Sequence, residues 1–142
     1  IRVKGDEVLR KKCKPVEAIG KREMIILQDM ADTMYKADGV GIAAPQVGIL
    51  KRMFLVDIGD ENGLMVFINP EILEVSGSQC GDEGCLSLPG ESHEVERPNY
   101  VKVKAFNEKG EEFILEGEEL LARGILHEND HLDGILYIDH VK

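Results

Sequence analysis

The sequence predicts an α+β fold in which mainly antiparallel strands surround a central helix late in the chain, with a second, amphipathic helix near the start. Apolar residues recur at helical spacing in two segments, about 21–37 and about 118–132. The chain between them holds runs typical of strands, at 52–58, 64–75, 100–106 and 112–116. No regular alternation of strand and helix is present, which favours antiparallel pairing.

The first helix carries an apolar, methionine-rich stripe that we expect to fill the core, because Met packs into irregular gaps. The stripe consists of Met24, Leu27, Met30, Ala31, Met34 and Tyr35. Asp38-Gly39 ends this helix. The following run, 39–48, is too short and too glycine-rich to predict a helix.

Turn residues separate the predicted strands, at 60–63 and at 108–110. The last helix is expected to end near Asp133-Gly134. Its apolar positions are Leu120, Leu121, Ile125 and Leu126. A further short strand is predicted at 135–138.

Length and charge narrow the classes of function. The 142 residues suit one domain, 1–142. A net charge of −10 repels phosphate backbones and anionic lipid, so direct nucleic-acid or membrane binding is not expected. No apolar run approaches the roughly 20 residues of a membrane span. Three cysteines leave at least one unpaired, which favours a reducing cytoplasm over a disulfide framework.

The segment 127–131, His-Glu-Asn-Asp-His, indicates a metal site. Residues four apart lie on one face of a helix, so His127 and His131 can bind one cation. Glu128 lies at the edge of that face, where it can take a proton from a water molecule without being a ligand. The alternative interpretation is a charged, solvated helix face.

Cys85 is the candidate third ligand, in the segment Glu83-Gly84-Cys85-Leu86-Ser87. Three protein ligands and an open position are typical of a catalytic metal site, whereas a structural site takes four. Cys80 is a candidate fourth ligand, and Cys13 and His140 are weaker candidates. A buried, inert thiol is the other interpretation of Cys85.

Three segments together resemble the peptide deformylase family. The run Gly39-Val40-Gly41-Ile42-Ala43-Ala44-Pro45-Gln46 is similar to the family motif GxGxAAxQ, residues 83–87 match EGCLS, and residues 127–131 match HExxH. They occur in the order of the family. The opening, Gly5-Asp6-Glu7-Val8-Leu9-Arg10, is also typical of it, so the resemblance covers nearly the whole chain.

The resemblance implies an enzyme that removes the formyl group from the N-terminal formyl-methionine of new polypeptides. It implies one divalent metal ion, Fe(II) in the cell with Zn(II), Ni(II) or Co(II) able to replace it, bound by Cys85, His127 and His131. Glu128 would act as general base and then acid. The side-chain amide of Gln46 and the backbone N–H of Leu86 would stabilise the oxyanion.

The resemblance also predicts the residues around the substrate. Val40, Gly41 and Gly84 would flank the bound peptide, with Gly41 allowing close approach of a backbone. Glu83 and Arg97 would pair and orient the Cys85 loop, and Asp130 could accept a hydrogen bond from a ligand imidazole.

The chain departs from the family pattern at two positions near the substrate. Ser92 stands where many members have a larger polar residue, which leaves that contact open. Arg123 stands where the methionine pocket is shaped, and we expect its stem on the pocket wall and its head in water.

The same residues leave two rival functions open. A zinc protease shares HExxH but needs a downstream third ligand, from Asp133, Asp139 or His140. A metal-bound structural module would need neither Glu128 nor Gln46.

Many members of the family carry a further C-terminal helix that in some docks on the ribosome. These 142 residues do not contain it, and the negative charge also argues against ribosome association by that route.

Overall fold

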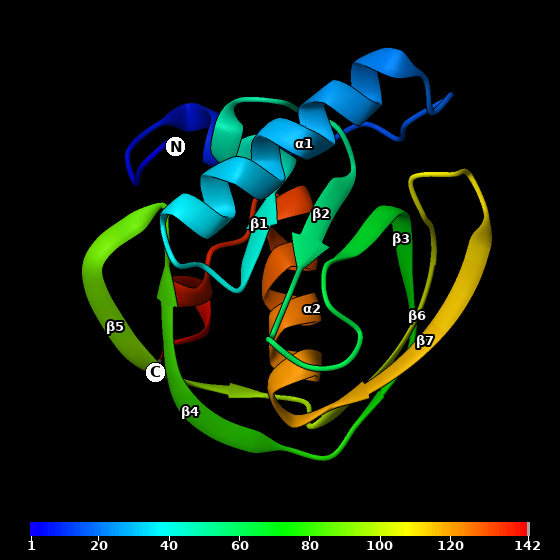
Figure 1. Cartoon of the computed structure of the whole chain (residues 1–142). Helices are drawn as coiled ribbons and strands as arrows, with labels where there is room; N and C mark the ends of the chain where they lie inside the picture. The colour runs from blue at the N-terminus through cyan, green and yellow to red at the C-terminus, as the bar shows by residue number, and fades with distance from the viewer. Residues whose placement is uncertain (142) are drawn as a thin grey trace.

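The computed structural model describes residues 1–141 and confirms the predicted class, with two long helices and mostly antiparallel strands (Figure 1). The helices are α1 (Lys21–Lys36) and α2 (Glu119–Leu132). A five-stranded antiparallel sheet contains, in spatial order, β1 (Gly41–Ala43), β2 (Met53–Val56), β3 (Met65–Ser76), β6 (Tyr100–Phe106) and β7 (Glu112–Glu118). A separate antiparallel hairpin consists of β4 (Gln79–Cys85) and β5 (Leu88–Arg97).

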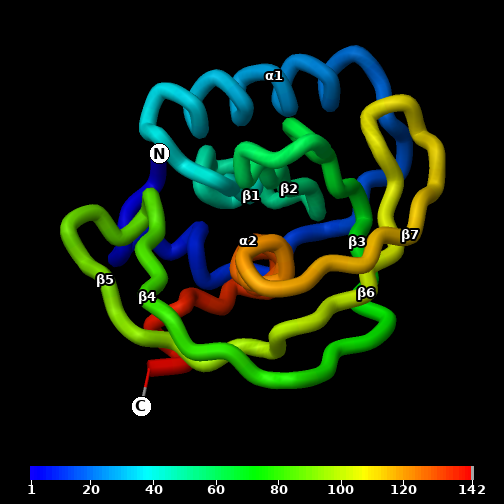
Figure 2. Tube along the Cα trace, turned by 60° about the horizontal axis from the view of Figure 1, so that its bottom comes forward, coloured from blue at the N-terminus to red at the C-terminus, as the bar shows by residue number. Residues whose placement is uncertain are grey.

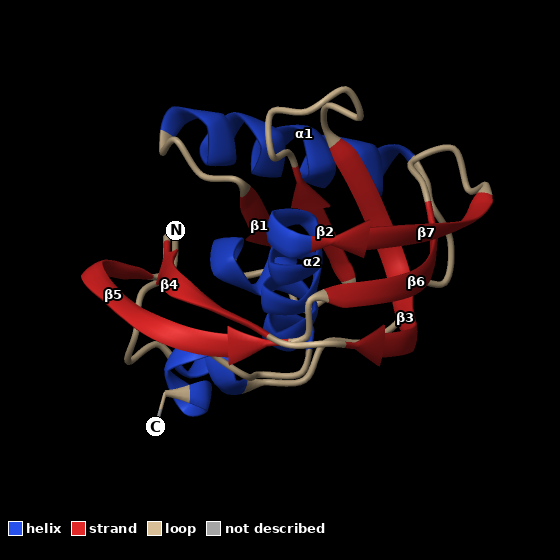
Figure 3. Cartoon of the chain, turned by 90° about the horizontal axis from the view of Figure 1, so that it is seen from below, coloured by secondary structure: helices blue, strands red, loops and turns tan. Residues whose placement is uncertain are grey.

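Helix α2 lies in the middle of the molecule. Viewed nearly along its axis in Figure 2, α2 has the curved five-stranded sheet on one side and the β4–β5 hairpin on the other. Register shifts between β3 and β6 are β-bulges, which bend a sheet and increase its twist. The view from below in Figure 3 shows the same enclosure. Polar side chains on α2 are therefore buried among other elements.

Strand β2 is buried on both faces because it separates two apolar cores. Met53 and Leu55 belong to the core under α1, whereas Phe54 and Val56 belong to the core around α2. Successive side chains of a strand point to opposite faces, so one apolar run can serve both cores. On the α2 side, the rings of Phe54 and Phe67 stack with centroids 4.6 Å apart.

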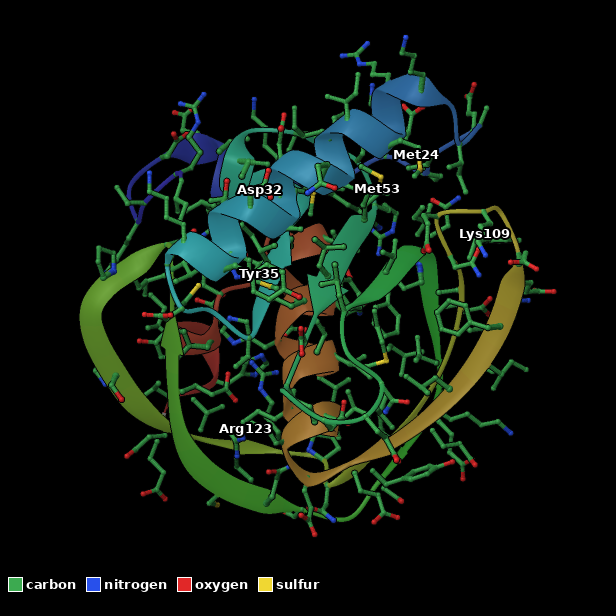
Figure 4. The ribbon with its side chains drawn as sticks, in the orientation of Figure 1. Met24, Asp32, Tyr35, Met53, Lys109 and Arg123 are labelled. Carbon is green, nitrogen blue, oxygen red and sulfur yellow. The ribbon has the colours of Figure 1, made fainter. Side chains whose placement is uncertain are left out.

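The predicted stripe of α1 is confirmed at its four buried members, Leu27, Met30, Ala31 and Met34. It is wrong at Met24 and Tyr35, whose side chains are 44% and 48% exposed (Figure 4). In the first turn Glu23 points inward instead, because its carboxylate accepts hydrogen bonds from the Gly20 N–H and from Lys51. Tyr35 stays at the surface, where its hydroxyl donates to Asp57 at 2.6 Å.

The β4–β5 hairpin was absent from the sequence prediction. Glycine and charged residues are depleted in strands, and this segment is rich in both. Its fully buried positions are of mixed character, with Leu88 and Val95 beside Glu83 and Arg97. Because half of the inward face is charged, no apolar alternation marks the hairpin in the sequence.

The strand predicted at 135–138 is wrong. Leu136 is buried, but the chain turns there into a 3-10 helix, η3 (Tyr137–His140). The Leu136 N–H donates to the Asp139 carboxylate at 3.0 Å, and Arg10 holds the same carboxylate. A short apolar run does not by itself distinguish a strand from a helix. Here the hydrogen bond from Leu136 to Asp139 stabilises the start of the 3-10 helix.

Two further 3-10 turns lie in segments for which no helix was predicted, η1 (Glu7–Arg10) and η2 (Ala44–Val47). The small-residue run thus becomes strand β1 followed by η2. Among residues 1–141, no helix has the length and apolar character needed to cross a membrane.

We expect Gly134→Ala to destabilise the protein more than Gly59→Ala. Both glycines have positive φ, 74° and 77°, which costs about 1–2 kcal/mol for alanine. A Cβ at Gly59 meets nothing within 4 Å, whereas one at Gly134 overlaps the Arg10 carbonyl. That overlap adds about 1–3 kcal/mol. Urea unfolding of both variants measures the difference, and equal losses would show that the Arg10 contact imposes no constraint.

Candidate metal centre

The three predicted metal ligands come together in space from two elements. Cys85 is the last residue of β4, and His127 and His131 lie one turn apart on α2. One donor atom from each lies within 4.8 Å of the others, and Cys85 Sγ is 3.3 Å from His131 Nε2. A thiolate and two imidazoles in this arrangement can hold a divalent transition metal ion.

The imidazole of His127 is oriented by Glu83. His127 Nδ1 lies 2.7 Å from Glu83 Oε1. An ionised carboxylate only accepts hydrogen bonds, so Nδ1 carries a proton and Nε2 is the nitrogen left for the ligand cluster. Burial lowers the pKa of His127, but hydrogen bonds to Cys85 and Glu83 outweigh the burial and raise the pKa to about 10, so a bound cation would displace the proton on Nε2. At the other histidine, burial lowers the pKa of His131 to about 3, which keeps that ring neutral as a ligand must be.

Glu83 is itself buried and stays ionised. Burial raises its pKa, but hydrogen bonds from His127 and Arg97 outweigh the burial and hold the pKa at about 2. Arg97 donates twice, from Nε to Oε2 at 2.6 Å and from its NH2 group to Oε1 at 2.9 Å. The predicted pairing of Glu83 with Arg97 is therefore present beside the Cys85 end of β4.

The structure corrects two predictions about neighbouring side chains. The head of Arg123 does not lie in water, because it is buried and its NH1 group donates to Glu83 Oε2 at 2.5 Å. Asp130 does not accept from a ligand imidazole. Its Oδ2 instead accepts from the Arg97 NH1 group at 3.0 Å and lies 2.9 Å from His140 Nε2.

Glu128 lies beside the ligand cluster with one carboxylate oxygen unused. Oε1 is 3.9 Å from His127 Nε2, and Oε2 is buried without a hydrogen-bond partner. Burial is the main reason that its pKa rises to about 7. A Cβ at Gly41 would lie 2.8 Å from Glu128 Oε1, so the glycine makes room for this carboxylate. A carboxyl group with these properties suits proton transfer near neutral pH.

Gln46 reaches the cluster from η2. Its Oε1 accepts from the Ala43 N–H at 2.9 Å, which directs the amide Nε2 toward Cys85 Sγ at 3.5 Å. Nε2 also donates to the Ser87 hydroxyl at 3.0 Å. Ser87 is fully buried and was not singled out from the sequence, although it lies in the same segment as Cys85.

A cleft of about 430 Å³ opens onto this cluster. Its walls include eight of the nine residues predicted for the site, the exception being His131 on the inner side. These eight are Val40, Gly41, Gln46, Gly84, Cys85, Leu86, His127 and Glu128. Leu86 lies in the turn between β4 and β5, and Val40 is 47% exposed at the rim.

Comparison with known proteins places the chain in a family. The family model of polypeptide deformylase matches residues 1–142. The peptide deformylase of Clostridium botulinum is 66% identical over 98% of this chain and 93% of its own length, and peptide deformylase 1 of Clostridium acetobutylicum is 60% identical over 98% and 91%.

Solved structures agree with the sequence relatives. The crystal structure of peptide deformylase from Thermotoga maritima is 48% identical, with a TM-score of 0.96 over 100% of this chain and 96% of that one. A peptide deformylase from Synechococcus elongatus, solved in complex with actinonin, is 43% identical with a TM-score of 0.95 over 99% and 77%. With sequence and fold in agreement along its whole length, the chain belongs to the polypeptide deformylase family of hydrolases.

Proposed function

We propose that this protein is a metal-dependent hydrolase that removes the N-formyl group from the formyl-methionine of newly made polypeptides. One observation carries the proposal. Two members of a Cys-His-His donor set, Cys85 and His127, and the unpartnered, buried carboxylate of Glu128 line the same cleft of about 430 Å³, and the third donor, His131, lies close to both ligands. As part of the proposal, the chain acts as a single catalytic domain in the cytoplasm.

The residues present suit a divalent cation, because all three donors can face one point. Glu83 holds the Nδ1 proton of His127, which leaves Nε2 for the cation, and burial keeps His131 neutral. The ion we propose is Fe(II) in the cell, with Zn(II), Ni(II) or Co(II) able to occupy the same donors. When bound, such a cation supplies Lewis acidity, which makes a water molecule more acidic and polarises the formyl carbonyl.

Glu128 would move the proton. Its unpartnered Oε2 can accept the proton of the attacking water and then give it to the departing amine. The cleft wall removes this carboxylate from bulk water and raises its pKa to about 7, which favours a group that must gain and lose a proton in each cycle.

Hydrogen-bond donors that are already in place would stabilise the developing oxyanion. The Gln46 amide is anchored at its oxygen by Ala43, which holds its Nε2 at the cleft beside Cys85 Sγ. The backbone N–H of Leu86, beside Cys85, is the second proposed donor. Donors that are oriented before the reaction cost no reorganisation during it.

The peptide would lie along the cleft rim, between Val40 and Gly41 on one side and Gly84 on the other. Gly41 is the first residue of β1 and pairs with Val56 of β2. We propose that N-formylmethionyl chains are the partners recognised there.

A zinc-protease arrangement has less support than the deformylase arrangement. Its third ligand would lie downstream of His131, but Asp133, Asp139 and His140 are engaged by Arg52, Arg10 and Asp130 respectively. Within residues 1–141, the cluster of Cys85, His127 and His131 is the one group placed to hold an ion.

The metal role of Cys85 is tested with two cysteine variants. We expect Cys85→Ser to weaken Zn(II) binding more than roughly 100-fold, beyond the 10–100-fold typical of residues that only support a ligand. Cys80→Ser is the control, since Cys80 is exposed on the same strand. Chelator competition measures both. Equal affinities for Cys85→Ser and the parent would remove the thiolate from the site.

The proton-transfer role is tested by formate release from formyl-Met-Ala-Ser with Ni(II)- or Fe(II)-loaded protein kept free of oxygen. We expect Glu128→Gln to retain its metal and lose about 10²–10⁴-fold in kcat. Glu119→Gln, an exposed change on the same helix, should keep the parent rate. A parent protein that binds metal but releases no formate would contradict the proposed function.

Gln46→Glu separates oxyanion stabilisation from structure, because a carboxylate can still accept from Ala43 but cannot donate. We expect kcat to fall roughly 10²–10³-fold with a smaller change in KM, as for loss of one oxyanion donor. Steady-state kinetics on the same peptide measures both constants. An unchanged kcat would exclude the Gln46 amide from the reaction.

A further inference from the structure

Arg123 connects the two elements that carry the metal-binding residues. It lies on α2, one turn before His127, and Figure 4 shows it between α2 and β4. Its NH1 group donates to Glu83 Oε2 at 2.5 Å and to the Gly81 carbonyl at 3.3 Å. Both terminal nitrogens also lie 3.3 Å from the Val95 carbonyl. One guanidinium therefore binds β4, β5 and the carboxylate that orients His127.

The hairpin is shaped to receive this guanidinium. A Cβ at Gly81 would lie 3.2 Å from the Arg123 NH2 group and 3.5 Å from its Cζ. No positive φ requires glycine at this position. The space above Gly81 is therefore occupied by the arginine head, which is a second observation that the contact is built into the hairpin.

Glu83 has its hydrogen-bonding capacity divided evenly between its two oxygens. His127 and one nitrogen of Arg97 bind Oε1, whereas Arg97 Nε and Arg123 bind Oε2. Arg97 reaches Glu83 from β5 and also donates to Asp130 on α2 at 3.0 Å, so it connects the carboxylate to the helix only through that second residue. Apart from His127 itself, Arg123 is the α2 residue that donates to Glu83.

We propose that Arg123 is a positioning residue for the metal site. By fixing Glu83 Oε2 from α2, it sets the direction in which Oε1 receives the His127 N–H and thus aims His127 Nε2. By binding the hairpin carbonyls, it sets the distance between Cys85 on β4 and the two histidines on α2. This inference rests on the cation site of the proposed function and not on the identity of the substrate.

The contacts of Arg123 also limit its part in substrate binding. The residue lines the cleft, but its guanidinium is buried and engaged by Glu83 and by two backbone carbonyls. A substrate carboxylate would have to displace the Glu83 contact to reach it. Its aliphatic stem is thus the part left to face a ligand.

Cobalt(II) binding tests the proposal, because the visible absorption of a Co(II)–thiolate site reports coordination geometry without any substrate. Arg123→Met keeps an unbranched apolar stem and removes every donor, and Arg123→Lys restores one charged donor. Arg52→Met is the matched control. Arg52 also ties α2 to another element, through Leu132 O at 3.1 Å and Asp133 at 2.9 Å, without contacting Glu83.

We expect Arg123→Met to weaken Co(II) affinity about 10–100-fold and to alter the visible spectrum, with partial recovery in Arg123→Lys. Arg52→Met should stay within about twofold of the parent affinity whatever its loss of stability, since it shares no partner with the site. Parent-like affinity and spectrum in folded Arg123→Met would overturn the proposal. Equal weakening by Arg52→Met would also overturn it, in favour of general destabilisation.

A second variant keeps the test decisive if Arg123→Met does not fold. Gly81→Ala retains the arginine but shifts its head by a few tenths of an ångström, and we expect it to weaken Co(II) binding in the same direction as Arg123→Lys. Parent-like Co(II) affinity in both Gly81→Ala and Arg123→Lys would overturn the proposal. A parent protein that binds Co(II) yet releases no formate would contradict the proposed function while leaving this inference standing.

Discussion

The site depends on the ion pairs and hydrogen bonds that hold the buried Glu83 carboxylate. Moving a carboxylate out of water costs several kcal/mol, and the cost is tolerated only when charged partners and hydrogen bonds replace the water. Two guanidinium groups and an imidazole N–H supply those partners. Because the partners come from β5 and from α2, satisfying one charge also joins the hairpin to the central helix.

Placing the proposed catalytic face on a buried helix has a consequence for function. His127, Glu128 and His131 lie on the same rigid element as the apolar core residues Ile125 and Leu132. A site held by a packed helix keeps its geometry better than one held by loops. Cys85, by contrast, comes from a hairpin outside the main sheet, and the contacts around Glu83 compensate for that weaker attachment.

The small residues near the site are explained by what lies above them. Gly41 leaves room for the Glu128 carboxylate, and Gly81 leaves room for the Arg123 head. In a close-packed interior glycine is a specific requirement at such a position, because the methyl group of an alanine would push against the functional side chain beside it. The run that includes Gly41 serves the site, although its composition alone indicated only that it does not form a helix.

Periodicity predicted the elements whose burial is apolar. Both long helices and the strands of the main sheet after β1 were expected because their inward positions repeat at the spacing of the element. The β4–β5 hairpin was not expected, since Glu83 and Arg97 take inward positions that apolar residues would otherwise mark. The candidate metal ligands were also accessible from sequence, because ligand chemistry restricts residue types and the spacing of His127 and His131 restricts their geometry.

What the sequence alone determined, then, was the class of fold, the two helices, and the candidate donors Cys85, His127 and His131. Only the tertiary structure decided which partners Arg123 and Asp130 have. The reason is physical: Arg123 meets Glu83 40 positions away in the chain. Such a contact depends on how a hairpin packs against a helix and leaves no local pattern. The sequence limits which chemistry is available, and the packing selects which charges meet.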